Sequence, residues 1–594
     1  MREGHEVNMS ADAKLIWKKW AGRLVLLLFL VITFAARCHN RSQIFHDGGV
    51  FFVDGDCYSR MTRAKMVSEG HWIIRHHDFE NWPKGITPHT TALLDWMIVG
   101  LKPAVDLAYK VTDPQWKNPF HAQTLDVAGA LVSPLLGVLT AAWLWWWAGA
   151  MKLRFRGAMV LLFALSPIAV HGTVLGRPDH QSLLMFLLAV ALGCELWLIR
   201  PEDDGKKSHR AWGIAAGSAW GLALWVSLYE PLVLLVPVIV ARLLRERQTL
   251  LAVGSRGEWI ALWGFFLLGL LVDGWRVELP SAEFRENFGR WSSTIGELRP
   301  LKPTEPLLWQ WLGLLVLAAP VLLCLAGRED RCAFVLLGGF AILFALTAWQ
   351  RRWGYFLQLT FAVSVPWQLR AIRDVRMAWL AFAVGLWPML SSWWPEVKDR
   401  LRGGANAEVF DQAKEDQAWH QLGQTRLRTI ALKMREGSRA GFIAPWWISP
   451  QIAYWSGQPG VAGTSHQSLP GIVDTARFFL AADAEKAGEI LQRRRVGWVI
   501  VDPSADVDQR DRLHGVTNSE RVLGVAAPKE PMCELLNYYP KKAPSFLREV
   551  KPQELGLITQ IAPKDGSDPK DRGIQIVFTQ MQRLFHVERE TPKP

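Results

Sequence analysis

The sequence contains few cysteines for its length, and they are widely scattered. Only 6 of its 594 residues are cysteine. Their spacing matches neither a set of disulfide pairs nor the closely spaced ligands of a zinc site. The sequence therefore predicts neither a disulfide-stabilised scaffold nor a structural zinc centre.

Charged residues are also scarce over the first two thirds of the chain. Between about residues 17 and 394, long apolar stretches alternate with short charged loops, and the stretch AGRLVLLLFLVITFAA at 21–36 carries a single charge. A helix needs roughly 20 apolar residues to cross a membrane. No small-residue cleavage site follows the first stretch, so we expect a retained anchor and not a signal peptide. We predict a multi-pass integral membrane protein.

The apolar stretches predict about eleven spans, at 17–37, 126–149, 157–174, 181–199, 211–228, 230–245, 258–275, 307–327, 332–349, 354–370 and 377–394. Basic segments such as 151–156 and 370–376 fall in alternate loops, and cytoplasmic loops carry the excess of Lys and Arg. The N-terminus is therefore predicted to be cytoplasmic. The loops 38–125 and 276–306 are predicted to face outward.

The net charge of +12 does not indicate a nucleic-acid partner, because most of the surplus can be placed in loops on one side of a membrane. Beyond residue 400 the composition is that of a soluble domain. Residues 484–495 have helical periodicity, and 496–502 and 573–580 are typical of strands. We predict a transmembrane domain at 1–399 and a soluble mixed α/β domain at 400–594, on the outer face.

Two acidic segments follow predicted spans on the outer side. VDGDCYSRMTRA contains Asp54 and Asp56, and LGRPDHQSLL contains Arg177, Asp179 and its polar neighbours. Carboxylate oxygens suit a divalent cation, and such a cation suits phosphate. The alternative is that both segments are ordinary solvated turns.

Two further outer segments combine flexibility and positive charge. GRWSSTIGELRPL places Glu297 beside Ser and Gly residues in a long loop, which predicts a lid, or alternatively a simple linker. WQRRWGYFLQ contains Arg351 and Arg352. Paired guanidinium groups bind diphosphate well, although arginines at this depth also extend to lipid headgroups.

The predicted soluble domain contains an aromatic cluster in APWWISPQIAYWSG. Trp446 and Trp447 are adjacent, and Ile448 follows them. Such a cluster is either core packing or the wall of a binding site.

Together these segments resemble the catalytic subunit of oligosaccharyltransferase, a membrane glycosyltransferase of the GT-C fold, from about residue 20 to about 505. DCYSRMTRA and FENWPKG resemble the first acidic motif and the stretch after it, and GRPDHQ resembles the second acidic motif. TIGE at 294–297 matches the TIxE motif of the outer loop, QRRWGYF resembles the Arg-aromatic segment, and WWISPQ resembles the WWDYG region. The resemblance implies a multi-span α-helical protein with about 11–13 transmembrane helices, followed by a soluble α/β domain.

The resemblance also implies roles for individual residues. Asp56 and Glu297 would be catalytic. A divalent metal, Mg²⁺ or Mn²⁺, would be held by Asp56, Asp179, His180, Gln181 and Glu297. Arg352 and Arg351 would bind the donor diphosphate, and the acceptor would contact Trp446, Trp447, Ile448 and Glu297.

This chain departs from the family pattern at two positions. Gln181 stands where an acid or His is usual, although its carbonyl oxygen can still bind a metal. Ile448 stands in place of the WWD aspartate, which accepts a hydrogen bond from the Ser or Thr of an Asn-x-Ser/Thr acceptor. An isoleucine side chain cannot accept that bond. The count of about eleven spans is also below the family's usual number of about thirteen.

The function that the resemblance implies is transfer of a glycan from a polyprenyl-linked phosphate or diphosphate to a protein acceptor, an asparagine, outside a bacterial or archaeal cell membrane. One alternative is a GT-C glycosyltransferase with a lipid or non-sequon protein acceptor. Another is a non-catalytic transporter of lipid-linked glycan, which would explain the arginines but not the clustered acids. Membrane lipid surrounds the protein in every case.

Overall fold

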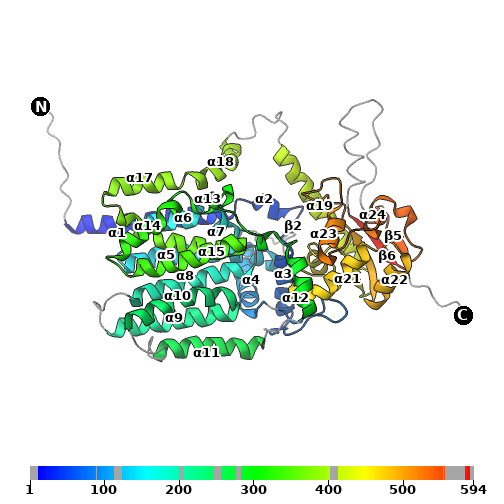
Figure 1. The fold of residues 1–594 in the computed structure, drawn as a ribbon, viewed down its shortest axis with the longest axis horizontal. Coiled ribbons are helices and arrows are strands. Elements are labelled where there is room, and N and C mark those ends of the chain that lie inside the picture. The colour runs from blue at the N-terminus through cyan, green and yellow to red at the C-terminus, as the bar shows by residue number, and fades with distance from the viewer. Residues whose placement is uncertain are drawn as a thin grey trace.

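The computed structural model of the chain describes residues 11–88, 90–112, 124–199, 206–246, 256–275, 282–401, 412–552, 554–555 and 582–588. A bundle of helices forms one half of the molecule, and the C-terminal helices and strands form the other (Figure 1). The short segments between the first and second long helices of the bundle lie where the two halves meet.

Each predicted span coincides with one bundle helix or with two consecutive ones. The helices are α1 (Ala11–Arg37), α5 (Thr124–Ala150), α6 (Arg156–Leu165), α7 (Pro167–His171), α8 (His180–Ile199), α9 (Lys206–Val226), α10 (Tyr229–Glu246), α11 (Arg256–Asp273), α13 (Pro306–Leu312), α14 (Leu315–Gly327), α15 (Cys332–Trp349), α16 (Gly354–Ala371), α17 (Val375–Gly385) and α18 (Trp387–Leu401). The periodic apolar stretches therefore located the helices correctly.

Fewer of these helices meet a strict test of length and apolar composition. Among the described residues, 4 helices are long and apolar enough to cross a membrane alone, and the total reaches 6 if the bent pairs α13–α14 and α17–α18 each count as one span. The chain is an integral membrane protein with a helical membrane half.

Close backbone approach holds α9 against α11. A Cβ atom added at Gly217 or Gly221 would clash with the backbone of α11 at Glu258 and Leu262. The two glycines are four residues apart and lie on one face of α9, which is the arrangement that allows membrane helices to pack closely.

A buried arginine fixes the end of α1. The Arg37 side chain is fully buried, and its Nε donates a hydrogen bond of 2.7 Å to Thr173 Oγ1. Its Nη1 donates to the carbonyls of Thr33 and Ala164 at 3.0 and 3.3 Å. An arginine at such a depth is tolerated only with polar partners of this kind, so it ties α1 to the loop that precedes α8.

Between α1 and α5 the chain forms the short elements α2 (Arg41–Ile44), β1 (Phe45–His46), β2 (Gly49–Val50), α3 (Gly55–Ser68) and α4 (Ala92–Thr112). The Asp54 side chain accepts a 3.0 Å hydrogen bond from the Cys57 backbone N–H and so caps the start of α3. Helices α3 and α4 are joined by Asp95, which is 1% exposed and binds Arg60 and Arg63.

The C-terminal half is mixed α/β, as predicted. Its main elements are α19 (Gln412–Arg435), β3 (Gly441–Ile443), α20 (Ser449–Ser456), α21 (Leu469–Phe479), α22 (Ala484–Arg493), β4 (Val496–Val501), α23 (His514–Leu523), α24 (Met532–Tyr538), β5 (Leu547–Glu549) and β6 (Arg583–Val587). The sheet order is β3-β4-β6-β5, with β3 parallel to β4 and the other pairs antiparallel.

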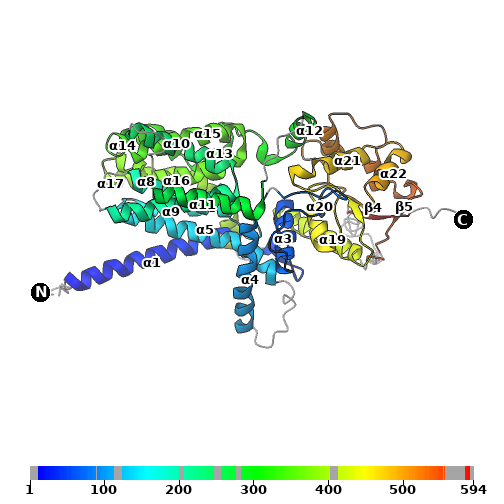
Figure 2. The ribbon, with the colours of Figure 1, turned by 90° about the horizontal axis from the view of Figure 1, so that it is seen from below.

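The predicted helix at 484–495 and the predicted strand at 496–502 are confirmed as α22 and β4. The strand predicted at 573–580 lies outside the described residues. Helices α19 and α20 lie beside α3 (Figure 2), and the Tyr454 hydroxyl donates a hydrogen bond to Asp126 at the start of α5. The C-terminal half is therefore docked on α3 and on the start of α5 in the membrane half.

The buried ion pairs of Asp95 should matter more for stability than a surface pair on the same helix. We expect Asp95→Ala to destabilise the protein by about 3 kcal/mol, because two buried arginines lose the carboxylate that compensates their charge. Asp106→Ala removes the half-exposed Lys102–Asp106 pair of α4 and should cost less than about 0.5 kcal/mol. Thermal unfolding in detergent measures both, and equal shifts in Tm would contradict the prediction.

Candidate active site

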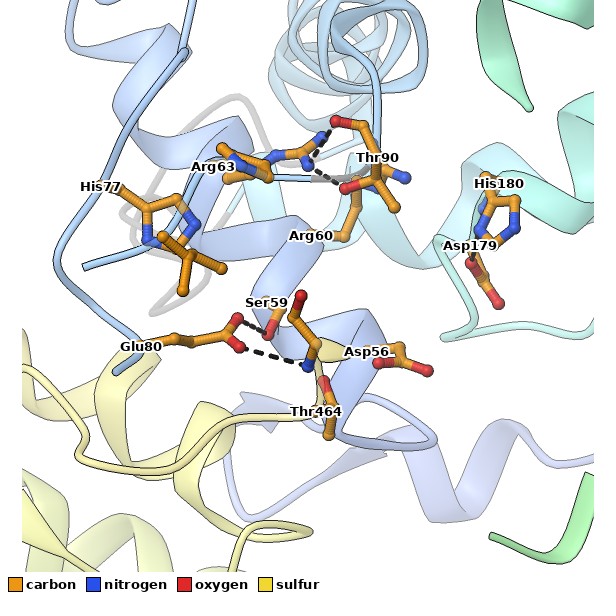
Figure 3. Close-up of a pocket in the computed structure, with 13 residues that line it drawn as sticks. Asp56, Ser59, Arg60, Arg63, His77, Glu80, Thr90, Asp179, His180 and Thr464 are labelled. Carbon is orange, nitrogen blue, oxygen red and sulfur yellow. Dashed lines mark hydrogen bonds and ion pairs between the residues drawn. The ribbon is translucent and has the colours of Figure 1, made fainter. Parts of the chain in front are cut away.

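A polar pocket lies where α3, the loop before α8 and a loop of the C-terminal half meet (Figure 3). Asp56 comes from α3, Asp179 from the loop before α8, and Thr464 from the C-terminal half. The pocket is lined by Asp56, Ser59, Arg60, Arg63, His77, Glu80, Ile86, Pro88, Thr90, Asp179, His180, Thr464 and Ser465. Residues from the two predicted acidic segments therefore share one pocket.

Asp56 lies in the first turn of α3, and its side chain is open to the pocket. Loss of solvation next to the surrounding protein raises the pKa of Asp56 well above its usual value, and the negative charges of Asp54 and Asp179 raise it further. A hydrogen bond with the Thr464 side chain acts in the opposite direction. Negative charge is thus concentrated around an accessible carboxylate.

Arg177 lies between two of these acids. Its Nη1 is 3.1 Å from Asp54 Oδ2 and its Nη2 is 3.7 Å from Asp179 Oδ2, while the arginine itself is 5% exposed. Asp179 Oδ1 lies 2.6 Å from His180 Nδ1. Burial would raise the pKa of Asp179, but the charges of His180 and Arg177 outweigh it and hold this pKa well below its usual value.

Glu297 lies in the short 3₁₀ helix η3 (Gly296–Leu298), and Arg352 lies in η4 (Arg351–Trp353). Burial raises the pKa of Glu297, and the positive charges of Arg352 and Arg177 oppose this rise. Asp179 also acts on Glu297, so these groups lie within electrostatic range of one another. Asp56 and Asp179 therefore share the pocket, whereas Glu297 and Arg352 do not line it and act on its acids over a longer range.

The two arginines of η4 have different partners. Arg352 Nη2 is 3.1 Å from Glu230 Oε1, at the start of α10. Arg351 Nη2 is 2.8 Å from Glu305 Oε2, and its Nε donates to the Pro300 carbonyl. Arg351 is therefore bound to the outer loop, and Arg352 is the arginine that interacts with the acids of the site.

The described part of the loop at 276–306 is ordered, whereas a flexible lid would be irregular. It contains α12 (Ala282–Ser292), whose Arg290 Nη1 donates a 3.0 Å hydrogen bond to the Leu523 carbonyl. At the other end, the backbone N–H of Arg351 donates to the Arg299 carbonyl at 3.0 Å. These contacts anchor the loop to both halves of the protein. Together with helix formation, they restrict the flexibility expected from its Ser and Gly residues.

The tryptophan pair is half-buried and contacts α12 and α23. Trp446 Nε1 donates a 3.0 Å hydrogen bond to Asn518 Oδ1, and its ring packs edge-on against Trp291 of α12 at 5.7 Å. The Trp447 ring lies 4.4 Å from the His514 ring. The half-buried Ile448 packs against the large hydrophobic core.

The tryptophan segment lies beside the first acidic segment. A Cβ atom added at Gly55 would be 3.2 Å from the Trp447 carbonyl oxygen and would clash with the Thr464 side chain. Gly55 directly precedes Asp56, so the residue without a side chain is what allows the C-terminal half to approach the acid this closely.

The side chains suit a hard divalent cation chemically, but they do not form a closed set of ligands. Gln181 is 4% exposed, and its Oε1 has no hydrogen-bond partner among the described residues. This buried oxygen and the carboxylates of Asp56, Asp179 and Glu297 are the donor type that Mg²⁺ and Mn²⁺ prefer. Within the described part of the chain, however, no three His, Cys, Asp or Glu side chains converge closely enough to hold a metal.

Several residues of the site had no signal in the sequence. Glu80 accepts hydrogen bonds from Ser59 Oγ at 2.9 Å and from the Ser465 backbone N–H at 3.3 Å. Together with Thr464, these contacts join the C-terminal half to the pocket. They link residues far apart in the chain, and serine and threonine are too common for a single sequence to identify them.

Comparison with known proteins supports the fold. The sequence matches no family model. Over 171 residues it is 23% identical to dolichyl-phosphooligosaccharide-protein glycotransferase 1 of Archaeoglobus fulgidus, a match that covers 28% of this chain and 26% of that protein. The chain thus matches only about a quarter of the length of this relative.

Solved structures match over a greater length. The chain is similar to the archaeal oligosaccharyltransferase AglB from Archaeoglobus fulgidus in complex with an inhibitory peptide and a dolichol-phosphate, with a TM-score of 0.63, 14% identity, and coverage of 90% of this chain and 79% of that one. A structure of the Archaeoglobus fulgidus oligosaccharyltransferase tethered with an acceptor peptide containing the NVT sequon gives a TM-score of 0.57 at 16% identity, and covers 82% and 70%. A further one, a complex with Zn and sulfate, gives 0.56 at 15%, and covers 81% and 68%. The predicted GT-C fold and the resemblance to oligosaccharyltransferase are confirmed at the level of the fold.

Proposed function

We propose that the protein is a glycosyltransferase of the oligosaccharyltransferase type. It transfers a glycan from a polyprenyl-linked phosphate or diphosphate to a protein acceptor, an asparagine. The observation that carries this proposal is that Asp56 and Asp179 line one pocket, with Glu297 and Arg352 within electrostatic range of them. The fold of an enzyme whose structures hold dolichol-phosphate and acceptor peptide supports it.

The roles follow from the charge of each group. The Arg352 guanidinium binds the phosphate oxygens of the donor, because its planar fork matches them. Asp56 and Glu297 accept hydrogen bonds from the acceptor amide and orient its nitrogen towards the anomeric carbon of the sugar. The C–N bond forms as the bond from the anomeric carbon to the carrier oxygen breaks, and the amide proton passes to a carboxylate.

A divalent cation, Mg²⁺ or Mn²⁺, would stabilise the negative charge of the departing phosphate when bound. Asp56, Asp179 and Glu297 would hold it, with the Gln181 carbonyl oxygen as a further ligand. His180 would take part through Nε2, because its Nδ1 faces Asp179. Burial is the main cause of the raised pKa of Asp56, and the additional repulsion from Asp54 and Asp179 is the physical reason to expect a cation here.

The division of labour between the domains is part of the same proposal. The transmembrane domain at 1–399 supplies the acids and arginines, and the domain at 400–594 covers them from the outer side. The basic loops place the N-terminus in the cytoplasm of a bacterial or archaeal cell and the active site outside.

The acceptor rule is the part of the proposal most specific to this chain. Ile448 packs against the core and offers no hydrogen-bond acceptor to a Ser or Thr hydroxyl of a peptide. This favours an acceptor less restricted than Asn-x-Ser/Thr, which is the non-sequon alternative raised by the sequence. Trp446 and Trp447 then provide contact area beside the acidic site.

Removal of the central carboxylate tests the enzymatic assignment. We expect Asp56→Asn and Glu297→Gln each to lower the rate of glycan transfer by about 100-fold or more, because each removes a charge that orients the amide. The measurement is mass spectrometry of glycopeptide formed by the purified protein from a polyprenyl-diphosphate-linked glycan. Glu329→Gln, in an exposed surface pair, is the control. Undiminished transfer in both site variants would show that these two carboxylates are not catalytic, whereas no transfer by the unaltered protein would favour a non-catalytic transporter.

Chelation tests the metal. Treatment with EDTA should lower transfer by about 100-fold, since the charge of the departing phosphate loses its largest stabilising group, and Mg²⁺ or Mn²⁺ should restore it. Mn²⁺ binding, followed by electron paramagnetic resonance, should weaken in Asp179→Asn. Full activity after exhaustive chelation would withdraw the metal while leaving the glycosyltransferase assignment in place.

Peptide selectivity tests the acceptor rule. We expect transfer to a peptide with Asn-x-Thr and to its Asn-x-Ala counterpart to differ by less than about tenfold. Ile448 accepts no hydrogen bond from the threonine hydroxyl, and a single hydrogen bond from this hydroxyl to another group is worth only about 1 kcal/mol. Ile448→Asp should increase the preference for the threonine peptide. A strict requirement for Thr or Ser in the unaltered protein would contradict the looser rule.

A further inference from the structure

Two adjacent arginines of η4 each pair with a glutamate, but the two glutamates lie in different environments. The Glu305 side chain, paired with Arg351, is 29% exposed. The Glu230 side chain, paired with Arg352, is 3% exposed. A charge as buried as Glu230 requires a fixed partner, whereas an exposed pair forms and breaks at little cost.

The Glu230 carboxylate is held on both oxygens. Oε2 accepts a hydrogen bond from Ser227 Oγ, and Oε1 lies 3.1 Å from Arg352 Nη2. Glu230 lies in the first turn of α10, where the helix dipole favours a negative charge. Because the carboxylate is buried and bound on both oxygens, it is a fixed anchor for the arginine.

Arg352 is bound at one edge only. Among the described residues its guanidinium donates one hydrogen bond, to Glu230, although it carries five N–H groups. Its side chain is 31% exposed. After Glu230, the charges that act most strongly on it are those of Glu297 and Asp179, the second of which lines the acidic pocket. The donors left over are therefore available to an anion that enters this site.

We propose that Glu230 is a positioning residue that holds Arg352 by one edge, so that its remaining N–H groups bind the phosphate or diphosphate of the lipid-linked donor. This rests on the proposed function, and assigns a role to a residue that the family motifs do not cover. A guanidinium fixed before binding loses less conformational freedom when the donor arrives, which increases affinity. The negative charge of Glu230 acts against this gain, because it partly neutralises the arginine.

These two effects can be separated by substitution. Glu230→Gln keeps an oxygen that accepts the hydrogen bond from Arg352 but removes the opposing charge. Glu230→Ala removes both the anchor and the charge. Positioning therefore predicts opposite results for the two variants, while a purely electrostatic role predicts that both tighten anion binding.

The experiment measures the affinity of the purified full-length protein, in lipid nanodiscs, for a polyprenyl diphosphate and for the uncharged polyprenol. We expect Glu230→Ala to weaken diphosphate binding about tenfold and Glu230→Gln to keep it within about threefold or to tighten it. The matched control is Glu305→Ala, which frees the neighbouring arginine and should change the affinity less than about twofold. Polyprenol binding should not change in any variant.

Transfer kinetics give the second readout. Glu230→Ala should raise the donor KM by about tenfold while kcat changes by less than about threefold, since the lost interaction is with the bound carrier phosphate. If Glu230→Ala fails to fold, Ser227→Ala loosens the same carboxylate without changing a charge, and it should weaken diphosphate binding by about threefold.

Equal effects of Glu230→Ala and Glu305→Ala would overturn the inference, as would equal weakening in Glu230→Ala and Glu230→Gln or a parallel loss of polyprenol binding. Arg352→Ala distinguishes this from a failure of the proposed function. If Arg352→Ala weakens diphosphate binding and Glu230→Ala does not, only the positioning role is wrong. If Arg352→Ala binds diphosphate normally, the donor role of Arg352 is wrong as well.

Discussion

The ion pairs of Arg177 hold together the two acidic segments on which the site depends. Asp54 caps α3 and also binds Arg177, which in turn contacts Asp179 in the loop before α8. The His171 Nε2 atom lies 3.3 Å from Arg177 Nη1. Because one buried guanidinium pairs with both Asp54 and Asp179 and compensates part of their charge, these two acids can lie near Asp56, which remains open to the pocket.

The same requirement for compensated charge explains the arrangement of the remaining elements. Glu230 pairs with Arg352, and Asp95 pairs with Arg60 and Arg63, which line the pocket. Each pair joins two separate segments, so charge balance and positioning are achieved by the same contacts. The C-terminal half adds aromatic packing to these ionic contacts, since the Trp446 ring packs against Trp291 of α12.

The sequence was sufficient to locate the long apolar helices and to single out the acids and arginines at their ends. Apolar runs locate membrane helices because hydrocarbon tolerates little else, and acids or arginines in such a chain stand out for the same reason. What it did not reveal was α12, whose residues are polar enough to be mistaken for a flexible loop. It also did not reveal Thr464 and Glu80, because contacts between distant segments depend on how the two halves dock.

The docking of the two halves bears directly on the missing aspartate at position 448. Trp447 and Thr464 both lie against Gly55, so the C-terminal half contacts the acidic helix through more than one segment. Thr464 bonds to Asp56 itself, and Ser465 bonds to Glu80. The loop at 463–465 therefore supplies polar groups to Asp56 and Glu80, whereas Ile448 packs against the large hydrophobic core. An apolar side chain at 448 offers no hydrogen-bond acceptor, but the polar contacts of Asp56 do not depend on it.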